Sequence, residues 1–443
     1  MFKRRLINLE FLIFLLLLPY PVFAQYSVGG GGKTPLLAER NSANDIDVYL
    51  VYGTNGVEVS YTSSSASHQW FRYRTKASDS EPVTAQQNGT TSVVQNVEEG
   101  YGYFVKESTG FTKYIWIIDY SKYKPELNAL SVAENERRCD GVTLEGSGQI
   151  VPLYYHIPSG TQIELVRKFE LKYNTLEWVE NDRTFRTVYA TDTISGNPFG
   201  RYFPLSLYAD TEFELTGDLF ARYFNEEKTV ISDLFTAVAL QISADTTMVS
   251  SDSGFTQESD NGAFSAPLEV HFTAYANEPV ANSFVWKIYL IEDSTQFMLN
   301  YRGSELDYIF EREGKYRVEL TVLDRTGTCE DQSVSYDVEI SDFYWDAPNA
   351  FSPGSSSGIN DEFKIVYRSI VSFKGWIFNR WGNEIFHWTN PELGWDGKKG
   401  GKYVAPGVYF YVLEAKGSDG KTHKKTGSIN ILRSKTNRDE VVE

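Results

Sequence analysis

The sequence predicts an all-β protein, and its composition, its turn spacing and its length support this. The 443 residues include 29 Tyr, 28 Phe and 9 Trp but only 3 Met. Aromatic and β-branched side chains fit the pleated, half-buried surface of a sheet, and clusters of Gly, Asn and Asp supply the turns. A chain of this length exceeds one hydrophobic core, so we expect three or four domains.

The first 24 residues have the pattern of a secretory signal peptide. Three basic residues at positions 3–5 precede an apolar run at residues 11–18. That run is too short for a permanent transmembrane helix, and the small residues after it predict cleavage between Ala24 and Gln25. Residues 1–24 are therefore predicted to be removed, and the mature chain is predicted to be exported.

The charge distribution and the cysteine count limit the partners and the cross-links. The formal net charge is −17, although residues 351–443 are slightly basic. An acidic body disfavours nucleic acid and anionic membrane surfaces as partners. Cys139 and Cys329 lie in different predicted domains, so we expect two separate thiols rather than a disulfide bond.

A leader and two β-rich domains are predicted to follow the signal peptide. Residues 25–44 contain a run of glycines without an apolar period, which favours a flexible leader. Residues 45–125 contain short alternating runs at the spacing of a β-sandwich. Residues 126–249 hold longer, less regular runs and predict a second β-rich domain. Within this domain the apolar stretch 230–242 fits either a long strand or a short helix.

A third sandwich is predicted over residues 263–342, after a linker at 250–262 that is rich in Ser, Asp and Gly. Trp286 lies in the middle of an early predicted strand, and Gly314 opens an alternating late strand. A buried Trp that faces such a late strand is typical of a seven-stranded sandwich.

This third region resembles the late strands of a PKD-type immunoglobulin-like domain. Trp286 is followed by Lys-Ile-Tyr, whereas the PKD signature has Trp-Asp-Phe-Gly-Asp-Gly. The fold class that we predict for the whole chain is a series of immunoglobulin-like β-sandwiches that ends in a small β-sandwich. The residues that carry the resemblance are Tyr308, Phe310, Gly314, Tyr316, Val318, Leu320, Val322, Asp324 and Gly327.

The last quarter of the chain alternates aromatic runs with turns whose residue types are highly specific. Prolines near its start hold the chain extended, and Gly, Asn and Asp residues accept the backbone angles of tight turns. A final hairpin is predicted from 408–415 and 422–432. The residues that define the pattern are Phe351, Pro353, Gly358, Asn360, Asp361, Phe363, Asn379, Arg380, Trp381, Gly382, Trp395, Asp396, Gly397, Pro406, Gly407, Tyr409 and Gly427.

In order, spacing and position these residues closely resemble the gliding-motility-associated C-terminal domain, which is the type B sorting domain of type IX secretion substrates. The resemblance covers residues 346–433 and leaves a charged tail at 434–443. It implies export through the outer membrane, with presentation at the cell surface or release from it. It also implies an outer-membrane partner of the PorP/SprF kind.

Two details of the tail bear on ligands. In the first motif loop, Gly354 and serines 355–357 replace the family's Asn-Gly-Asp, so we expect no metal and interpret Asp361 as a turn cap. The receptor-binding surface is expected to combine the turn at Asn379 and Arg380 with the basic final hairpin. The alternative is that these charges are simply solvated. The basic residues of that hairpin are Lys421, Lys424, Lys425 and Arg433.

No catalytic pattern stands out, and we predict a protein that is not an enzyme and holds no cofactor. No histidine forms a metal-binding pair or follows a nucleophile motif. A group of aromatic residues in the first domain fits either a sugar-stacking platform or an ordinary sandwich core. The histidines are His68, His156, His271, His387 and His423, and the aromatic residues are Trp70, Phe71, Tyr73, Tyr101 and Tyr103.

The predicted function is that of an exported structural or adhesive protein, secreted or held at the cell surface, with a possible glycan or protein ligand there. One alternative is a glycan-binding or glycan-processing cargo whose active region lies within residues 126–248. The other is an accessory component of the gliding or secretion machinery.

Overall fold

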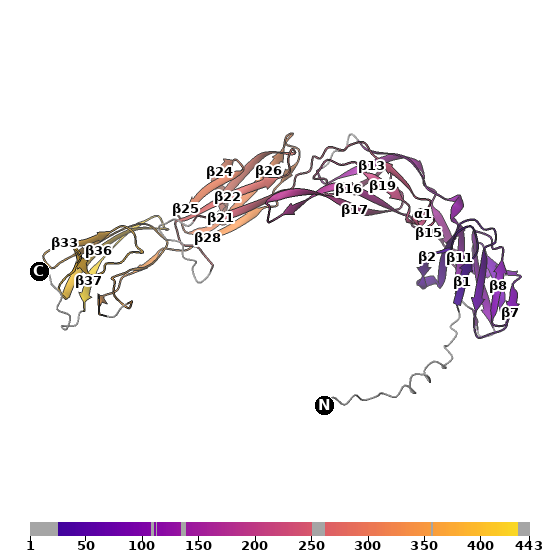
Figure 1. The fold of residues 1–443 in the computed structure, drawn as a ribbon, viewed down its shortest axis with the longest axis horizontal. Coiled ribbons are helices and arrows are strands. Elements are labelled where there is room, and N and C mark those ends of the chain that lie inside the picture. Colours follow the sequence, from indigo (N-terminus) through magenta and orange to yellow (C-terminus); the bar gives the residue numbers. More distant parts are fainter. Residues whose placement is uncertain are drawn as a thin grey trace, which may run out of the picture.

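The computed structural model describes residues 25–107, 110–111, 113–133, 139–249, 262–355 and 358–432. In these residues the chain is built almost entirely from strands, which confirms the all-β fold class. Figure 1 shows four domains that follow one another along an elongated, curved molecule. The predicted signal peptide, the tail at 434–443 and nearly all of the predicted linker lie outside the described residues.

The first domain contains two sheets. One has the strand order β1-β4-β8-β7, and the other has the order β2-β3-β11-β9-β5-β6, with β10 beside β9. Three short 3-10 helices lie between strands, at Ser42–Asn44, Ala77–Asp79 and Tyr120–Lys122. The strands are β1 (Gln25–Gly29), β2 (Leu36–Asn41), β3 (Ile46–Val51), β4 (Glu58–Thr62), β5 (Gln69–Tyr73), β6 (Glu81–Val83), β7 (Gln86–Asn88), β8 (Thr91–Gln95), β9 (Tyr101–Glu107), β10 (Gly110–Phe111) and β11 (Tyr114–Asp119).

The predicted flexible leader at 25–44 is wrong, because these residues form β1 and β2. β1 pairs with β4, and β2 pairs with β3. Tyr26 and Val28 alternate along β1 and pack against the core between the two sheets. Two apolar residues are too few for a sequence pattern, but the pairing with β4 places them against the core, where they are partly buried.

The larger sheet of the first domain is buried on both faces. Val51, Tyr103 and Ile117 face the smaller sheet. On the other face, Val48 and Trp116 pack against residues from β14, β15 and α1. Strands covered on both sides carry apolar residues in succession instead of alternating them with polar ones. This explains the unbroken apolar run at 115–118.

The second domain packs a sheet of order β12-β13-β18 against a sheet of order β17-β16-β19-β20. Its core includes Leu144, Phe169 and Phe213, all fully buried. The stretch 230–242 forms neither a long strand nor a helix, since β20 ends at Ile231. The elements are β12 (Glu126–Val132), β13 (Gly141–Gln149), β14 (Leu153–His156), β15 (Gln162–Leu165), β16 (Lys168–Val179), β17 (Thr184–Ser195), β18 (Arg201–Pro204), β19 (Glu214–Gly217), α1 (Leu219–Tyr223) and β20 (Lys228–Ile231).

The junction of the first two domains is fixed by a buried ion pair. Arg167 Nη1 lies 2.5 Å from Asp218 Oδ2, and both side chains are almost completely buried. Asp218 also accepts hydrogen bonds from the Tyr120 hydroxyl and from the backbone of Ala221 at the start of α1. Arg167 in turn donates to the carbonyl of Val151. A buried charge pair of this kind needs every further hydrogen bond to be satisfied, and this network supplies them.

The third domain is a sandwich of a sheet β21-β22-β25 and a sheet β24-β23-β26-β27, in which β28 also pairs with β26. Trp286 is fully buried at its centre. The first strand of this domain lies before the predicted linker, so the domain begins earlier than residue 263. The strands are β21 (Ile242–Met248), β22 (Leu268–Ala276), β23 (Ala281–Leu290), β24 (Asp293–Arg302), β25 (Glu305–Phe310), β26 (Gly314–Asp324), β27 (Glu330–Asp331) and β28 (Ser335–Ile340).

Cys139 and Cys329 form a disulfide bond between the second and third domains. The prediction of two separate thiols is therefore wrong. Their sequence separation of 190 residues indicated different domains, and it could not show that the domain ends meet. The same junction is reinforced where Trp178, near the tip of the β16–β17 hairpin, packs on Tyr275 with ring centroids 5.1 Å apart.

The C-terminal domain contains a five-stranded sheet of order β30-β37-β36-β32-β33 and two small two-stranded sheets. Phe363 and Trp395 are fully buried in its core. The predicted final hairpin is present as β36 and β37. The strands are β29 (Tyr344–Asp346), β30 (Ala350–Phe351), β31 (Val366–Arg368), β32 (Ile370–Phe378), β33 (Glu384–Trp388), β34 (Lys398–Lys399), β35 (Lys402–Tyr403), β36 (Gly407–Gly417) and β37 (Thr422–Ile431).

Candidate functional site

The C-terminal domain has an inner end, which touches the third domain, and an outer end, which faces away from it. At the inner end the turn between β36 and β37 is docked, because Glu313 N donates to the carbonyl of Ser418. Ser369 reaches the same junction, where its backbone N donates to Ser265 Oγ over 2.7 Å. Figure 1 shows β33 at the outer end.

The predicted turn after β32 lies at the outer end and is fixed by one side chain. Asn379 Oδ1 accepts hydrogen bonds from the backbone N of Trp381 at 3.0 Å and of Asn383 at 2.9 Å. Gly382 takes a positive φ of 82°, a backbone conformation that would be strained in a residue with a side chain. The side chains of Arg380 and Trp381 are therefore exposed to solvent instead of packing in the core. The guanidinium lies 4.0 Å from the indole centroid, and Trp381 is 68% exposed.

A second group of motif residues holds the loops of the outer half together. Trp395 donates its indole N–H to the carbonyl of Lys398, and its backbone pairs with Phe363. Gly397 takes a positive φ, and a Cβ there would stand 2.7 Å from Pro353. This close approach requires glycine. Asp396 accepts the backbone N–H of Lys398, and the ion pair between their side chains raises the pKa of the Lys398 ammonium.

Asp361 acts as a turn cap, as predicted. Its Oδ2 accepts the backbone N–H of Gly358 over 2.6 Å, and Asn360 takes a positive φ in the same turn. Within the described ranges, no three His, Cys, Asp or Glu side chains come close enough together to hold a metal ion.

The remaining motif residues shape the final hairpin. Pro406 directly precedes β36, which begins at Gly407 at the outer end, and the Tyr409 hydroxyl donates to the carbonyl of Ala405. Burial raises the pKa of Tyr409, so its hydroxyl stays a donor. Gly427 lies directly opposite Tyr411, and a Cβ on it would meet the Tyr411 hydroxyl at 2.4 Å.

The two halves of the predicted receptor surface lie at opposite ends of the sheet. Phe378, just before the Arg380 turn, pairs with Phe410, whereas Ile370 pairs with Gly417 beside the inner turn. Lys421 follows that inner turn. Lys424 and Lys425 are paired with Glu414 and Asp346, and each pairing lowers the pKa of the acid. Arg433 lies outside the described residues. The described residues of the predicted receptor surface therefore do not form one contiguous patch.

Comparison with known families identifies the C-terminal domain. Residues 345–431 match the model of the CHU_C Type IX secretion signal domain. This part of the chain is a type B sorting domain. A signal of this family implies a cargo that type IX secretion exports across the outer membrane, to the cell surface or the extracellular space. Residues 131–232, in the second domain, match the model of the fibronectin type III domain.

No curated protein matches the sequence. Solved structures align with low scores. The tetra-tandem repeat in the extending region of a large adhesion protein is 10% identical and has a TM-score of 0.20, with 86% of this chain and 96% of that one covered. A Ca2+-stabilized adhesin from an Antarctic bacterium has a TM-score of 0.18 at 10% identity, covering 86% and 94%. Scores this low do not establish a shared overall arrangement.

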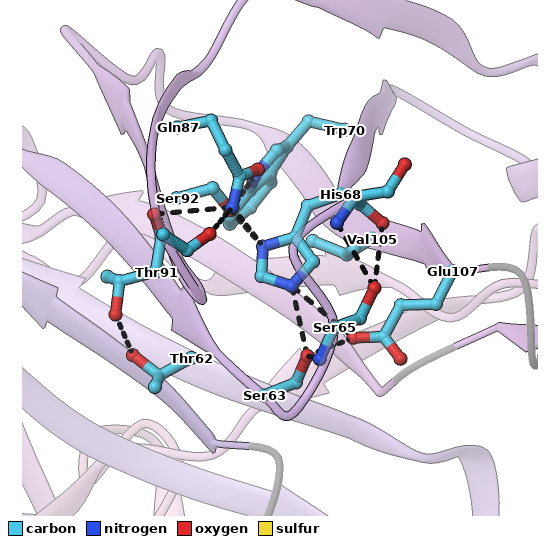
Figure 2. Close-up of polar contacts among 12 residues, drawn as sticks. Thr62, Ser63, Ser65, His68, Trp70, Gln87, Thr91, Ser92, Val105 and Glu107 are labelled. Atoms are coloured by element: carbon cyan, nitrogen blue, oxygen red, sulfur yellow. Dashed lines mark hydrogen bonds and ion pairs between the residues drawn. The ribbon is translucent and has the colours of Figure 1, made fainter.

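Among the described histidines, His68 lies in the densest polar cluster (Figure 2). Its Nε2 lies 3.0 Å from Ser63 Oγ, and its Nδ1 lies 2.7 Å from Ser92 Oγ. Ser63 Oγ donates directly to Glu107, whereas in a nucleophile triad the histidine stands between the hydroxyl and the acid. Ser63 is only 3% exposed. The cluster therefore ties the loop between β4 and β5 to β8 and β9.

The aromatic residues considered for a sugar platform belong to the cores of the first domain. Trp70 and Tyr103 face the smaller sheet, and Tyr73 faces the opposite way, each 2% exposed or less. Phe71 and Tyr101 are partly covered by Lys106 and Arg72. A flat shared surface is absent because successive residues of a strand point to opposite faces.

A cavity of about 360 Å³ lies where the first and second domains meet, and sequence reasoning missed it. Trp116 and Ile118 of β11 line one side, and Tyr154 and Gln162 of the β14–β15 hairpin line the other. The only sequence signal was the number of aromatic residues in both segments.

In the part of the chain that the structure describes, no helix is long and apolar enough to span a bilayer.

Proposed function

We propose that the chain is a non-enzymatic cargo of type IX secretion that serves a structural or adhesive role at the cell surface or outside the cell. The observation that carries this proposal is the folded sorting domain joined to a series of β-sandwiches with locked junctions. The disulfide bond joins the second and third domains, and buried serines join the third to the sorting domain. Locked junctions suit a protein that holds a binding surface away from the cell.

The outer end of the sorting domain is the proposed contact for an outer-membrane protein of the PorP/SprF kind. Trp381 and Arg380 form an exposed pair of an aromatic and a cationic side chain there. Trp and Arg dominate the energetics of protein interfaces because they bury large surfaces and still make directed contacts. The inner end is occupied by the third domain, for which we infer a PKD-like sandwich.

Localisation after selective substitution tests this contact. The combined change Arg380→Ala and Trp381→Ala should leave the protein in the periplasm, as should deletion of residues 346–443. The matched control is Lys421→Ala with Lys424→Ala, which removes two cations nearer the inner end and should leave display unchanged. Normal display of the Arg380/Trp381 variant would show that the contact lies elsewhere. Normal display after the deletion would refute the sorting role.

Attachment and hydrolysis assays test the role of the cargo. Cells that display the chain should adhere better to a host or polysaccharide surface than cells that lack it. Release of reducing ends from any glycan by the purified mature chain would overturn the non-enzymatic proposal.

A further inference from the structure

The cavity between the first two domains has the position and size of a small-molecule site. It measures about 360 Å³ and is lined by residues from β11, from the loop after it and from the β14–β15 hairpin. Binding sites commonly occupy clefts of about 300–1,000 Å³ at domain interfaces. The walls are held by the Arg167–Asp218 network, because Arg167 binds the carbonyls of Val151 and Tyr123, both lining residues.

One wall contains a hydrogen-bond donor without a partner. Trp116 is 2% exposed, and its Nε1–H is buried with no hydrogen-bond partner among the described residues. A buried donor left unpaired is unfavourable, and most such groups in folded proteins find an acceptor. An acceptor oxygen on a ligand in the cavity would supply one once the indole turns, because the Nε1 atom itself has almost no accessible surface.

The opposite wall offers a ring and an amide. Tyr154 is 46% exposed, although Leu153 and Tyr155 beside it are buried. Gln162 lies across the hairpin on the same exposed side and contributes both a donor and an acceptor. Exposed aromatic faces with nearby polar groups suit ligands that have an apolar ring face and a polar edge.

The charge of the lining disfavours strongly anionic ligands. None of the lining residues is Lys, Arg or His, and the only carboxylate is that of Glu99. Glu99 forms an ion pair with Lys122. Burial, followed by the Glu99 carboxylate, raises the pKa of Tyr123, which keeps its hydroxyl neutral as a donor. A phosphate or uronate would meet the carboxylate of Glu99, already paired with Lys122, and no cationic side chain among the lining residues.

We propose that this cavity binds a neutral saccharide unit, stacked on Tyr154 and hydrogen-bonded to Trp116 Nε1, Glu99 and Gln162. Sugars combine an apolar ring face with hydroxyls that both donate and accept, which matches this lining. The proposal rests on the adhesive role proposed above, since it names the class of ligand that the displayed chain would hold.

Calorimetric titration of the purified mature chain, residues 25–443, tests the proposal. The neutral probes are cellobiose, mannobiose and chitobiose, and digalacturonate is the anionic probe. At least one neutral disaccharide should bind saturably and digalacturonate should not. Tyr154→Ala should weaken that binding about tenfold by loss of stacking. Trp116→Phe keeps a ring but removes the N–H, and should weaken binding about fivefold.

Tyr301→Ala is the matched control, because Tyr301 is 42% exposed but lies in the third domain. It should bind like the unmodified chain. Saturable binding by none of the neutral probes, preference for digalacturonate, or unchanged affinity in Tyr154→Ala would each overturn the proposal. If Trp116→Phe does not fold, the affinity of the Tyr154→Ala variant still tests the proposal, because Tyr154 is exposed.

The attachment assay separates this failure from a failure of the adhesive role. One outcome is that cells displaying Tyr154→Ala still bind the surface although the purified variant no longer binds the sugar. That result would show that the cavity binds free saccharides and does not contribute to attachment. Cells with the unmodified chain that do not attach, although the sugar binds, would refute adhesion alone.

Discussion

Cys139 and Cys329 are joined by a disulfide bond across the boundary of the second and third domains, although 190 residues separate them. Several non-covalent contacts accompany the bond at this boundary, among them an ion pair between Arg183 and Asp245. Asn277 donates to the carbonyls of Tyr208 and Ala239, and Trp178 packs on Tyr275. A covalent link beside these non-covalent contacts makes the junction depend on the redox state.

Replacing both cysteines with serine should loosen the junction without unfolding either domain. A disulfide bond typically stabilises a protein by about 2–4 kcal/mol, so we expect a lower apparent melting temperature. Small-angle scattering should also show a broader distribution of lengths. Reductant should shift the unmodified chain in the same direction and leave the double variant unchanged. Identical scattering from both proteins would show that the other contacts suffice.

Asp218→Ala should strongly destabilise the junction of the first two domains. It leaves Arg167, which is 2% exposed, as a buried charge without its partner, and breaking such a pair costs about 3–5 kcal/mol. Urea unfolding followed by fluorescence measures the loss. Arg222→Ala, which breaks the ion pairs of an exposed arginine with Glu227 and Glu170, should cost about 0–1 kcal/mol. Equal effects of the two substitutions would contradict the assigned role of the buried pair.

Gly427→Ala should destabilise the sorting domain, because the added Cβ meets the Tyr411 hydroxyl at 2.4 Å. Tyr411 is held against Phe363, with ring centroids 5.4 Å apart, so it cannot move freely. Overpacking of this kind costs about 1–3 kcal/mol. Ser428→Ala, exposed on the same strand, should change stability by about 0.5 kcal/mol at most. Calorimetric melting of the full mature chain compares the two variants.

The attachment of the β1–β2 segment should weaken in acid. Hydrogen bonds from Lys33 and Tyr52 lower the pKa of Glu226 from 4.5 to about 2. A carboxyl group with a depressed pKa stabilises the folded state above its unfolded pKa, and this contribution is lost as the pH falls towards the folded value. When the pH is lowered from 5 to 2, the melting temperature of Glu226→Gln should therefore fall less than that of the unmodified chain. Glu145→Gln, at an exposed position in β13, should behave like the unmodified chain.

Strands with a clear period were predictable from the sequence. The run around Tyr316 alternates cleanly because one face is buried and the other is in water, and it forms β26. The turns of the sorting domain were also predictable, since Asn379, Gly382 and Gly397 are needed for local geometry. β1 was missed because its few apolar residues reach the core only by pairing with β4, about thirty residues further along the chain.

The candidate sites show the same division. The sequence by itself determined the all-β class and the sorting motif, because strand alternation and tight turns depend on neighbouring residues. Only the tertiary structure decided that Cys139 meets Cys329, that Arg380 lies at the opposite end of the sheet from the inner turn, and that Trp116 faces the β14–β15 hairpin across a cavity. These relationships depend on how separate sheets pack, and contacts between distant segments leave no local pattern in the chain.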